Sequence, residues 1–239
     1  FADSKVPDGF APFDVQVLNG QVYVSYAKQD AAKHDDVAGQ GNGFVDVFNL
    51  NGTPGLAGGK VRLVTRGRLD SPWGLAIAPA GFAAIGAPHN DPVLLVGNFG
   101  DGSINAFDAT TGNFLTQLKD SNGQPIQIDG LWALKVGNGG AGGSANTVYF
   151  TAGPMDETHG LFGSLSTAAP RPASAGDTLS AVRLSSSGSV PIAAQSGAAI
   201  TRGLVSTPGS DGALTNLDLT TVATVLSKGK HVNVADGHE

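Results

Sequence analysis

The chain has 239 residues, of which only 14% are charged, and its 14 Lys and Arg against 20 Asp and Glu give a formal net charge of −6. This balance argues against nucleic-acid binding, because phosphate recognition needs clustered cationic side chains. The chain has no cysteine, which excludes disulfides and thiolate chemistry, and no apolar run of about 18 residues predicts a membrane-spanning helix.

The first unit, at about residues 10–66, predicts four short strands. Apolar residues recur over residues 15–17, 22–26, 44–48 and 61–64. Asn19-Gly20 and Asn51-Gly52 separate some of these runs, and such dipeptides accept the positive φ angles of tight hairpin turns.

Two further units show the same pattern. The second unit, at about residues 70–120, predicts strands over 73–78, 93–99, 103–107 and 114–118. The third, at about 128–184, predicts strands over 131–136, 147–151, 161–165 and 179–184. Residues 31–42 and 137–146 are expected to form long loops.

Aromatic residues and glycines repeat at a nearly constant spacing along these units. Phe13, Trp73 and Trp132 are 60 and 59 residues apart, and Gly43, Gly102 and Gly160 are 59 and 58 apart. A fixed period of short strands is typical of repeat architectures. We therefore expect an all-β chain with about three four-stranded β-propeller blades, forming part of a six-bladed ring. Phe13, Trp73 and Trp132 are expected to pack between blades rather than to bind a sugar.

The character of the sequence changes after the third unit. Residues 167–176 are expected to be a linker, and residues 177–239 are rich in Ser, Thr, Ala and Gly, with no aromatic residue after Phe162. This tail is expected to complete the last blade and wrap on the propeller, to form a small accessory β region, or to be partly disordered.

Residues 1–166 resemble a family of secreted, uncharacterised bacterial β-propeller proteins. The motifs that carry the resemblance include VPDGFAPFDVQ, SPWGLAIAPAGF, LLVGNFGDGSINAFD and VYFTAGPMDETHGLFGSL. The resemblance implies a propeller of about six blades, of which this stretch is the C-terminal half, and a secreted, periplasmic or cell-surface location. It implies no reaction and no catalytic residue. Because the chain begins with Phe1, we expect it to be processed or cut from a longer protein.

An arc of three blades would leave two apolar faces in water, which repeat proteins avoid. We therefore expect a second chain, or a second copy, to complete the ring.

The loops after the second strand of each unit carry the candidate ligand residues. Equivalent loops emerge at the same end of a propeller, so these side chains are expected to share one rim and to offer a divalent cation, calcium or magnesium above all, its oxygen ligands. The candidates are Asp30, His34, Asp35, Asp36, Asn98, Asp101, Asp156, Glu157 and His159. The alternative is that these residues form Asx turns and bind each other or water.

Two of these loops also carry candidates for acid–base chemistry. His34 or His159 could pair with Asp156 or Glu157, because histidine titrates near neutral pH. No G-x-S-x-G motif supports a serine hydrolase, and the glycine-rich segment 137–143 lacks the Lys-Ser/Thr of a phosphate loop.

Three functions remain open, since a propeller supports many functions. The favoured one is a secreted, non-catalytic binding or assembly module. The second is a metal-dependent lyase or hydrolase acting in the central channel, and the third is a structural subunit of an extracellular assembly.

Overall fold

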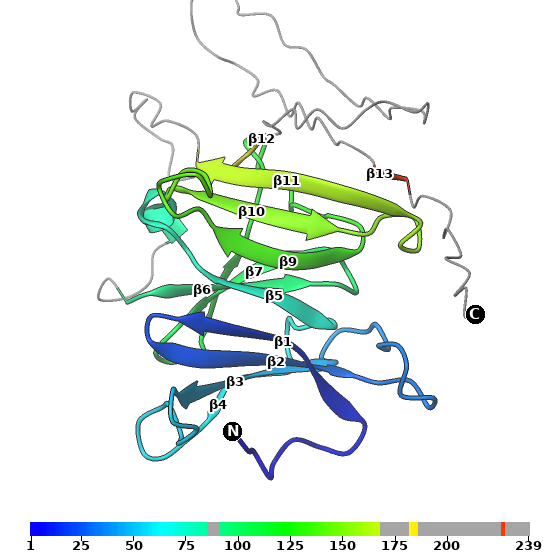
Figure 1. Ribbon diagram of the computed structural model, residues 1–239, viewed down its shortest axis with the longest axis vertical. Helices are drawn as coiled ribbons and strands as arrows, with labels where there is room; N and C mark the ends of the chain where they lie inside the picture. Colours follow the sequence, from blue (N-terminus) through cyan, green and yellow to red (C-terminus); the bar gives the residue numbers. More distant parts are fainter. Residues whose placement is uncertain (86–90, 168–181, 186–225, 228–239) are drawn as a thin grey trace, which may run out of the picture.

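A computed structural model describes residues 1–85, 91–167, 182–185 and 226–227 (Figure 1). This part of the chain is all-β, as the sequence predicts, and its strands form three antiparallel sheets. Its helices include none that is long and apolar enough to cross a membrane.

Each sheet takes its strands in chain order from one repeat unit. The first sheet consists of β1 (Phe10–Leu18), β2 (Gln21–Lys28), β3 (Gly43–Asn49) and β4 (Arg62–Thr65). The second consists of β5 (Pro72–Ile77), β6 (Val93–Asn98), β7 (Ile104–Asp108) and β8 (Phe114–Gln117). The third consists of β9 (Leu131–Val136), β10 (Thr147–Ala152), β11 (His159–Thr167) and β12 (Val182–Ser185), and β13 (Leu226–Ser227) also pairs with β11.

The tight turns have the backbone that their sequences predict. Asn19 and Gly20, which join β1 to β2, have φ angles of 48° and 76°. A β-branched residue would be strained at either position, whereas Asn and Gly adopt this left-handed conformation readily. The turn therefore fixes the register in which Leu18 faces Gln21.

The second sheet lies between the other two, and each of its faces forms a core (Figure 1). One core joins the first sheet to the second, with Tyr23 and Val45 packed in the same cluster as Leu75 and Val96. The other joins the second sheet to the third through residues such as Leu95, Ile104, Leu134 and Phe150. The side chains of the second sheet are divided between the two cores because successive side chains of a strand point to opposite faces of a sheet.

The first strands of the three sheets, β1, β5 and β9, lie side by side. A Cβ atom on Gly74 in β5 would lie 2.6 Å from the Trp132 carbonyl oxygen in β9. On the other side of β5, the rings of Phe13 and Trp73 meet edge to face with centroids 5.2 Å apart. These two aromatic residues thus pack between sheets, as predicted.

One element was not predicted from the sequence. Residues Ala80–Ile85 form a 3-10 helix, η1, after β5. The Phe82 amide donates to the Pro79 carbonyl, and the Phe82 side chain is buried in the core between the second and third sheets. Thr167, the first residue of the predicted linker 167–176, is instead the last residue of β11. The rest of that linker and most of the tail 177–239 lie outside the described residues, as does His89.

Candidate functional site

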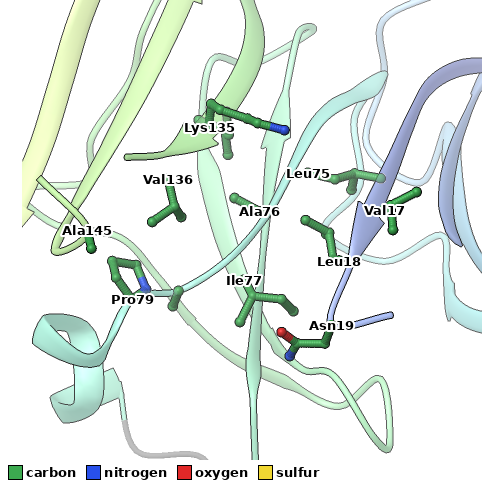
Figure 2. A pocket seen from close by; sticks show the side chains of 12 residues that line it. Val17, Leu18, Asn19, Leu75, Ala76, Ile77, Pro79, Lys135, Val136 and Ala145 are labelled. Carbon is green, nitrogen blue, oxygen red and sulfur yellow. The ribbon is translucent and has the colours of Figure 1, made fainter. Parts of the chain in front are cut away.

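A groove opens where the C-terminal ends of β1, β5 and β9 meet (Figure 2). Its volume is about 340 Å³, within the range of small-molecule sites. Aliphatic side chains make up most of its wall, and each of the three strands contributes some of them. The lining residues are Val17, Leu18, Asn19, Leu75, Ala76, Ile77, Ala78, Pro79, Leu134, Lys135, Val136 and Ala145.

Lys135 brings the cationic charge to this groove. Its ammonium group donates to the Gln16 side-chain oxygen at 3.2 Å, which joins β9 to β1 across the face of β5. Lys135 is exposed and the bond is to a neutral amide, so the positive charge stays available to a ligand. The groove therefore combines an aliphatic wall with one cation.

The loops that carry the predicted ligand residues lie at the opposite end of the strands. Antiparallel pairing places Leu18 against Gln21 at the groove end and Phe10 against Lys28 at the other end. The loop after β2 therefore begins away from the groove. The pairing of β5 with β6 and of β9 with β10 places the loops after β6 and β10 in the same way.

The first of these loops holds its polar side chains by local hydrogen bonds. The His34 amide donates to the Asp30 carboxylate at 2.8 Å, and this bond is the main reason that the pKa of Asp30 is lowered. His34 Nδ1 lies 3.2 Å from the Asp35 carboxylate, which raises the pKa of His34. Both residues of that pair are exposed to solvent, so the pair lies outside any enclosed reaction site.

The loop after β10 is likewise held by bonds to its own sheet. The indole N–H of Trp132 donates to the Glu157 carboxylate at 2.8 Å, and His159 Nδ1 lies 2.9 Å from the Thr158 hydroxyl. Asp156 and Glu157 have φ angles of 50° and 58°. This left-handed turn directs the chain back into β11 and places Glu157 over Trp132.

The first and second loops approach each other around Asp70. Asp36 and Asp101 both raise the pKa of Asp70, although burial is the larger cause, and the Gly39 amide donates to Asp70 at 2.6 Å. The Asn98 amide donates to Asp101 at 3.1 Å, while its buried side-chain oxygen has no hydrogen-bond partner in the described part of the chain.

The predicted cation site stays a prediction. Across residues 1–85 and 91–167, no three His, Asp or Glu side chains lie close enough together to hold a metal ion. The structure joins Asn98 to Asp101, and it brings Gly39 of the first loop and Gly100 of the second loop to Asp70. It holds Asp30, His34 and Asp35 by local contacts, and it ties Glu157 and His159 to the third sheet.

Two acids that the sequence analysis missed have a common signal. Asp70 and Asp129 each stand three residues before a tryptophan of the repeat. Each accepts a backbone amide from a loop that follows a second strand, Asp70 from Gly39 at 2.6 Å and Asp129 from Met155 at 2.9 Å. The D-x-x-W spacing could therefore have identified both as loop anchors.

Two aspartates in the strands, Asp108 and Asp46, have different kinds of partner. Asp108 accepts the Thr110 and Thr111 amides at 2.8 Å. Asp46 is instead fully buried and forms an ion pair with the partly buried Arg62, which also bonds Asp3 at 2.6 Å. The N-terminal segment is thereby held on the outer side of the first sheet.

Comparison with known proteins finds relatives of this chain that are themselves uncharacterized. Two uncharacterized proteins of Acanthamoeba polyphaga mimivirus are each 33% identical to it over 161 residues, which is 67% of this chain and 36% or 39% of theirs. A third mimivirus protein, also uncharacterized, is 30% identical over 150 residues, or 62% of this chain and 25% of its own length. The chain thus spans well under half of these curated relatives. No family model and no solved structure matches it.

Proposed function

We propose that the three sheets are consecutive blades of a β-propeller, and that the chain is a secreted, non-catalytic binding module. Three observations support this assignment. Each sheet contains a four-stranded antiparallel meander, to which the third sheet adds β13, the first strands of all three lie side by side, and the sheets pack face to face. The resemblance of residues 1–166 to secreted bacterial propellers supports it further. A second chain, or a second copy, completes the ring.

The observation that carries the binding function is the groove at the ends of β1, β5 and β9. An aliphatic wall favours an apolar ligand because burial of apolar surface removes it from water. The Lys135 ammonium favours an anionic group at the edge of that ligand. The proposed ligand class is therefore a small amphipathic anion with an aliphatic chain.

Calorimetric titration with decanoate tests this proposal. We expect one decanoate per chain, no measurable binding of acetate, and weaker binding of decanol, which lacks the charge. Lys135→Ala should weaken the binding of decanoate at least about tenfold, or about 1.4 kcal/mol, because it removes the cation that faces the carboxylate. The binding of decanol, which has no charge, should be nearly unchanged.

A matched pair of variants localises the binding. Ala145→Trp places a large ring at the groove wall, whereas Ala141→Trp changes an exposed residue of the same loop that does not line the groove. Loss of binding in the first variant alone supports the groove. Equal binding by both variants, or equal loss in both, would contradict it.

A metal-dependent lyase or hydrolase is the second candidate, and what favours it is the meeting of the first two loops at Asp70, whose carboxylate accepts the Gly39 amide and whose carbonyl accepts the Gly100 amide. Elemental analysis of the purified protein separates the two functions. One tightly held metal ion per chain would support the enzyme, and its absence would leave the binding module. A structural role in an extracellular assembly is compatible with either outcome of the binding assays and depends on the contacts of the outer sheets.

A further inference from the structure

The two outermost sheet faces carry exposed apolar side chains, and the residues at the equivalent positions of the other sheets are buried where two sheets meet. We name the side of the first sheet that points away from the second sheet the leading face, presenting Val15 and Val17. The opposite end of the stack is the trailing face, the side of the third sheet that points away from the second sheet, presenting Tyr149, Thr151 and Phe162.

Strand register identifies the equivalent residues. Val15 pairs with Val24 in the first sheet, Leu75 with Val96 in the second, and Leu134 with Phe150 in the third. Leu75 and Leu134 are fully buried because each packs on the preceding sheet, whereas 61% of Val15 is exposed. On β1, the leading face is therefore built like the faces that receive a preceding sheet, whereas on β3 the N-terminal segment covers it, with Phe1 packed on Phe48.

The trailing face shows the reverse relation. Phe162 on β11 stands at the register position of Val45 on β3 and Ile104 on β7. Val45 and Ile104 are fully buried against the next sheet, but 51% of Phe162 is exposed, and its ring stacks on that of Tyr149 with centroids 5.8 Å apart. This face is built like the faces that receive a following sheet.

A hydrogen-bond relay at the first junction repeats on the trailing face. The Asp14 amide donates to the Ser25 hydroxyl at 3.1 Å, and that hydroxyl donates to the Trp73 carbonyl of the next sheet at 3.0 Å. On the third sheet, the Ala133 amide donates to the Thr151 hydroxyl at 3.4 Å. Thr151 thus occupies the place of Ser25, whose hydroxyl donates to the following sheet.

We propose that two copies of this chain dock head to tail, the trailing face of each on the leading face of the other. This inference rests on the proposed propeller assignment and specifies how its ring closes. Phe162 and Tyr149 of one copy then cover Val15 and Val17 of the other, and Thr151 donates to the Phe13 carbonyl, the repeat equivalent of Trp73. A two-fold axis relates the copies, so both junctions form together.

Light scattering and sedimentation equilibrium on the full chain test the proposal. The wild-type protein should have twice the monomer mass of 24.0 kDa. Val15→Asp and Phe162→Asp should each weaken self-association at least about tenfold, because a buried unpaired charge is costly. Both side chains are exposed within one copy, so circular dichroism should show an unchanged fold.

A mixture and a control make the test specific to the head-to-tail arrangement. Mixing the two variants leaves one junction with native residues on both sides, so the mixture should form dimers that neither variant forms alone. Leu50→Asp changes an equally exposed residue outside both faces and should leave the dimer intact. A wild-type monomer up to about 100 µM, a mixture without dimers, or disruption by Leu50→Asp would overturn the proposal.

The ligand assay and the association test can each contradict one proposal without contradicting the other. A dimer that does not bind decanoate would retain the docking and remove the proposed ligand. A monomer that binds decanoate would do the reverse.

Discussion

Asp46 is a carboxyl group whose surroundings disfavour its charge. Its side chain is fully buried between β2 and β4, and burial raises its pKa from 3.8 to about 6, although Arg62 opposes the shift. An acid with a raised folded-state pKa favours the fold while it is protonated. Its contribution is complete below about pH 4 and is lost as the pH rises through about 6.

Asp46→Asn should therefore flatten the pH dependence of stability. The shift corresponds to about 3 kcal/mol at about 1.4 kcal/mol per pKa unit, so we expect the wild-type free energy of unfolding to fall by up to that amount between about pH 4 and pH 6.5. The variant stays neutral and should lack this slope. Urea unfolding at several pH values measures the difference, and parallel curves would contradict the assignment.

Ser25 provides a second test at the scale of one side chain. It is fully buried and its hydroxyl joins Asp14 of β1 to Trp73 of β5. Ser25→Ala leaves the Asp14 amide and the Trp73 carbonyl without this partner, which should cost about 1–3 kcal/mol. Urea unfolding should show this loss, whereas Ser4→Ala, at an exposed serine, should be neutral. Equal effects would contradict the role of the relay.

The sequence could identify which polar residues lie in loops, but not which ones meet. Asp30, His34 and Asp35 occur in the first predicted loop, as expected, yet bonds such as that from the His34 amide to Asp30 hold them locally. Short-range Asx turns of this kind satisfy polar groups without a ligand. The ion pair of Asp46 was not predictable, because its partner Arg62 lies on the neighbouring strand β4 and no local pattern reveals such a contact.

At the scale of elements, the approach of β5 to β9 depends on Gly74. A methyl group there would lie 2.6 Å from the Trp132 carbonyl oxygen and 2.7 Å from the Leu134 nitrogen. Gly74→Ala must therefore push two strands apart, which we expect to cost about 1–3 kcal/mol. Gly140→Ala is the control, since the nearest atom to its methyl group would be 3.5 Å away. Thermal unfolding compares the two variants, and equal melting temperatures would contradict this account.

The strands were predictable because each unit repeats short apolar runs between turn residues. Eleven of the twelve predicted strands overlap one of β1–β11, and the twelfth, at 179–184, overlaps β12. The 3-10 helix η1 was not predictable, because the sequence of Ala80–Ile85 has no helical periodicity of its own. Burial of Phe82 between two sheets accompanies this turn. The groove was equally hidden, since its wall comes from three strands that are distant in sequence.

At the scale of the whole molecule, the head-to-tail docking makes thermal stability depend on concentration. Association stabilises the folded state by mass action, so the melting temperature of the wild-type protein should rise between about 1 and 100 µM. Val15→Asp should remove most of this rise without lowering the melting temperature of the monomer. Differential scanning fluorimetry at several concentrations measures both quantities, and a wild-type melting temperature independent of concentration would contradict the prediction.

In the proposed dimer, each copy engages its partner at two junctions, one on its leading face and one on its trailing face, to which Thr151 contributes. Once the first junction between two copies has formed, the remaining leading and trailing faces are held at a high local concentration. The second junction therefore needs no further diffusional encounter. The half-joined species of the proposed dimer is therefore short-lived. Small changes in the affinity of one junction would consequently shift the population between single chains and dimers.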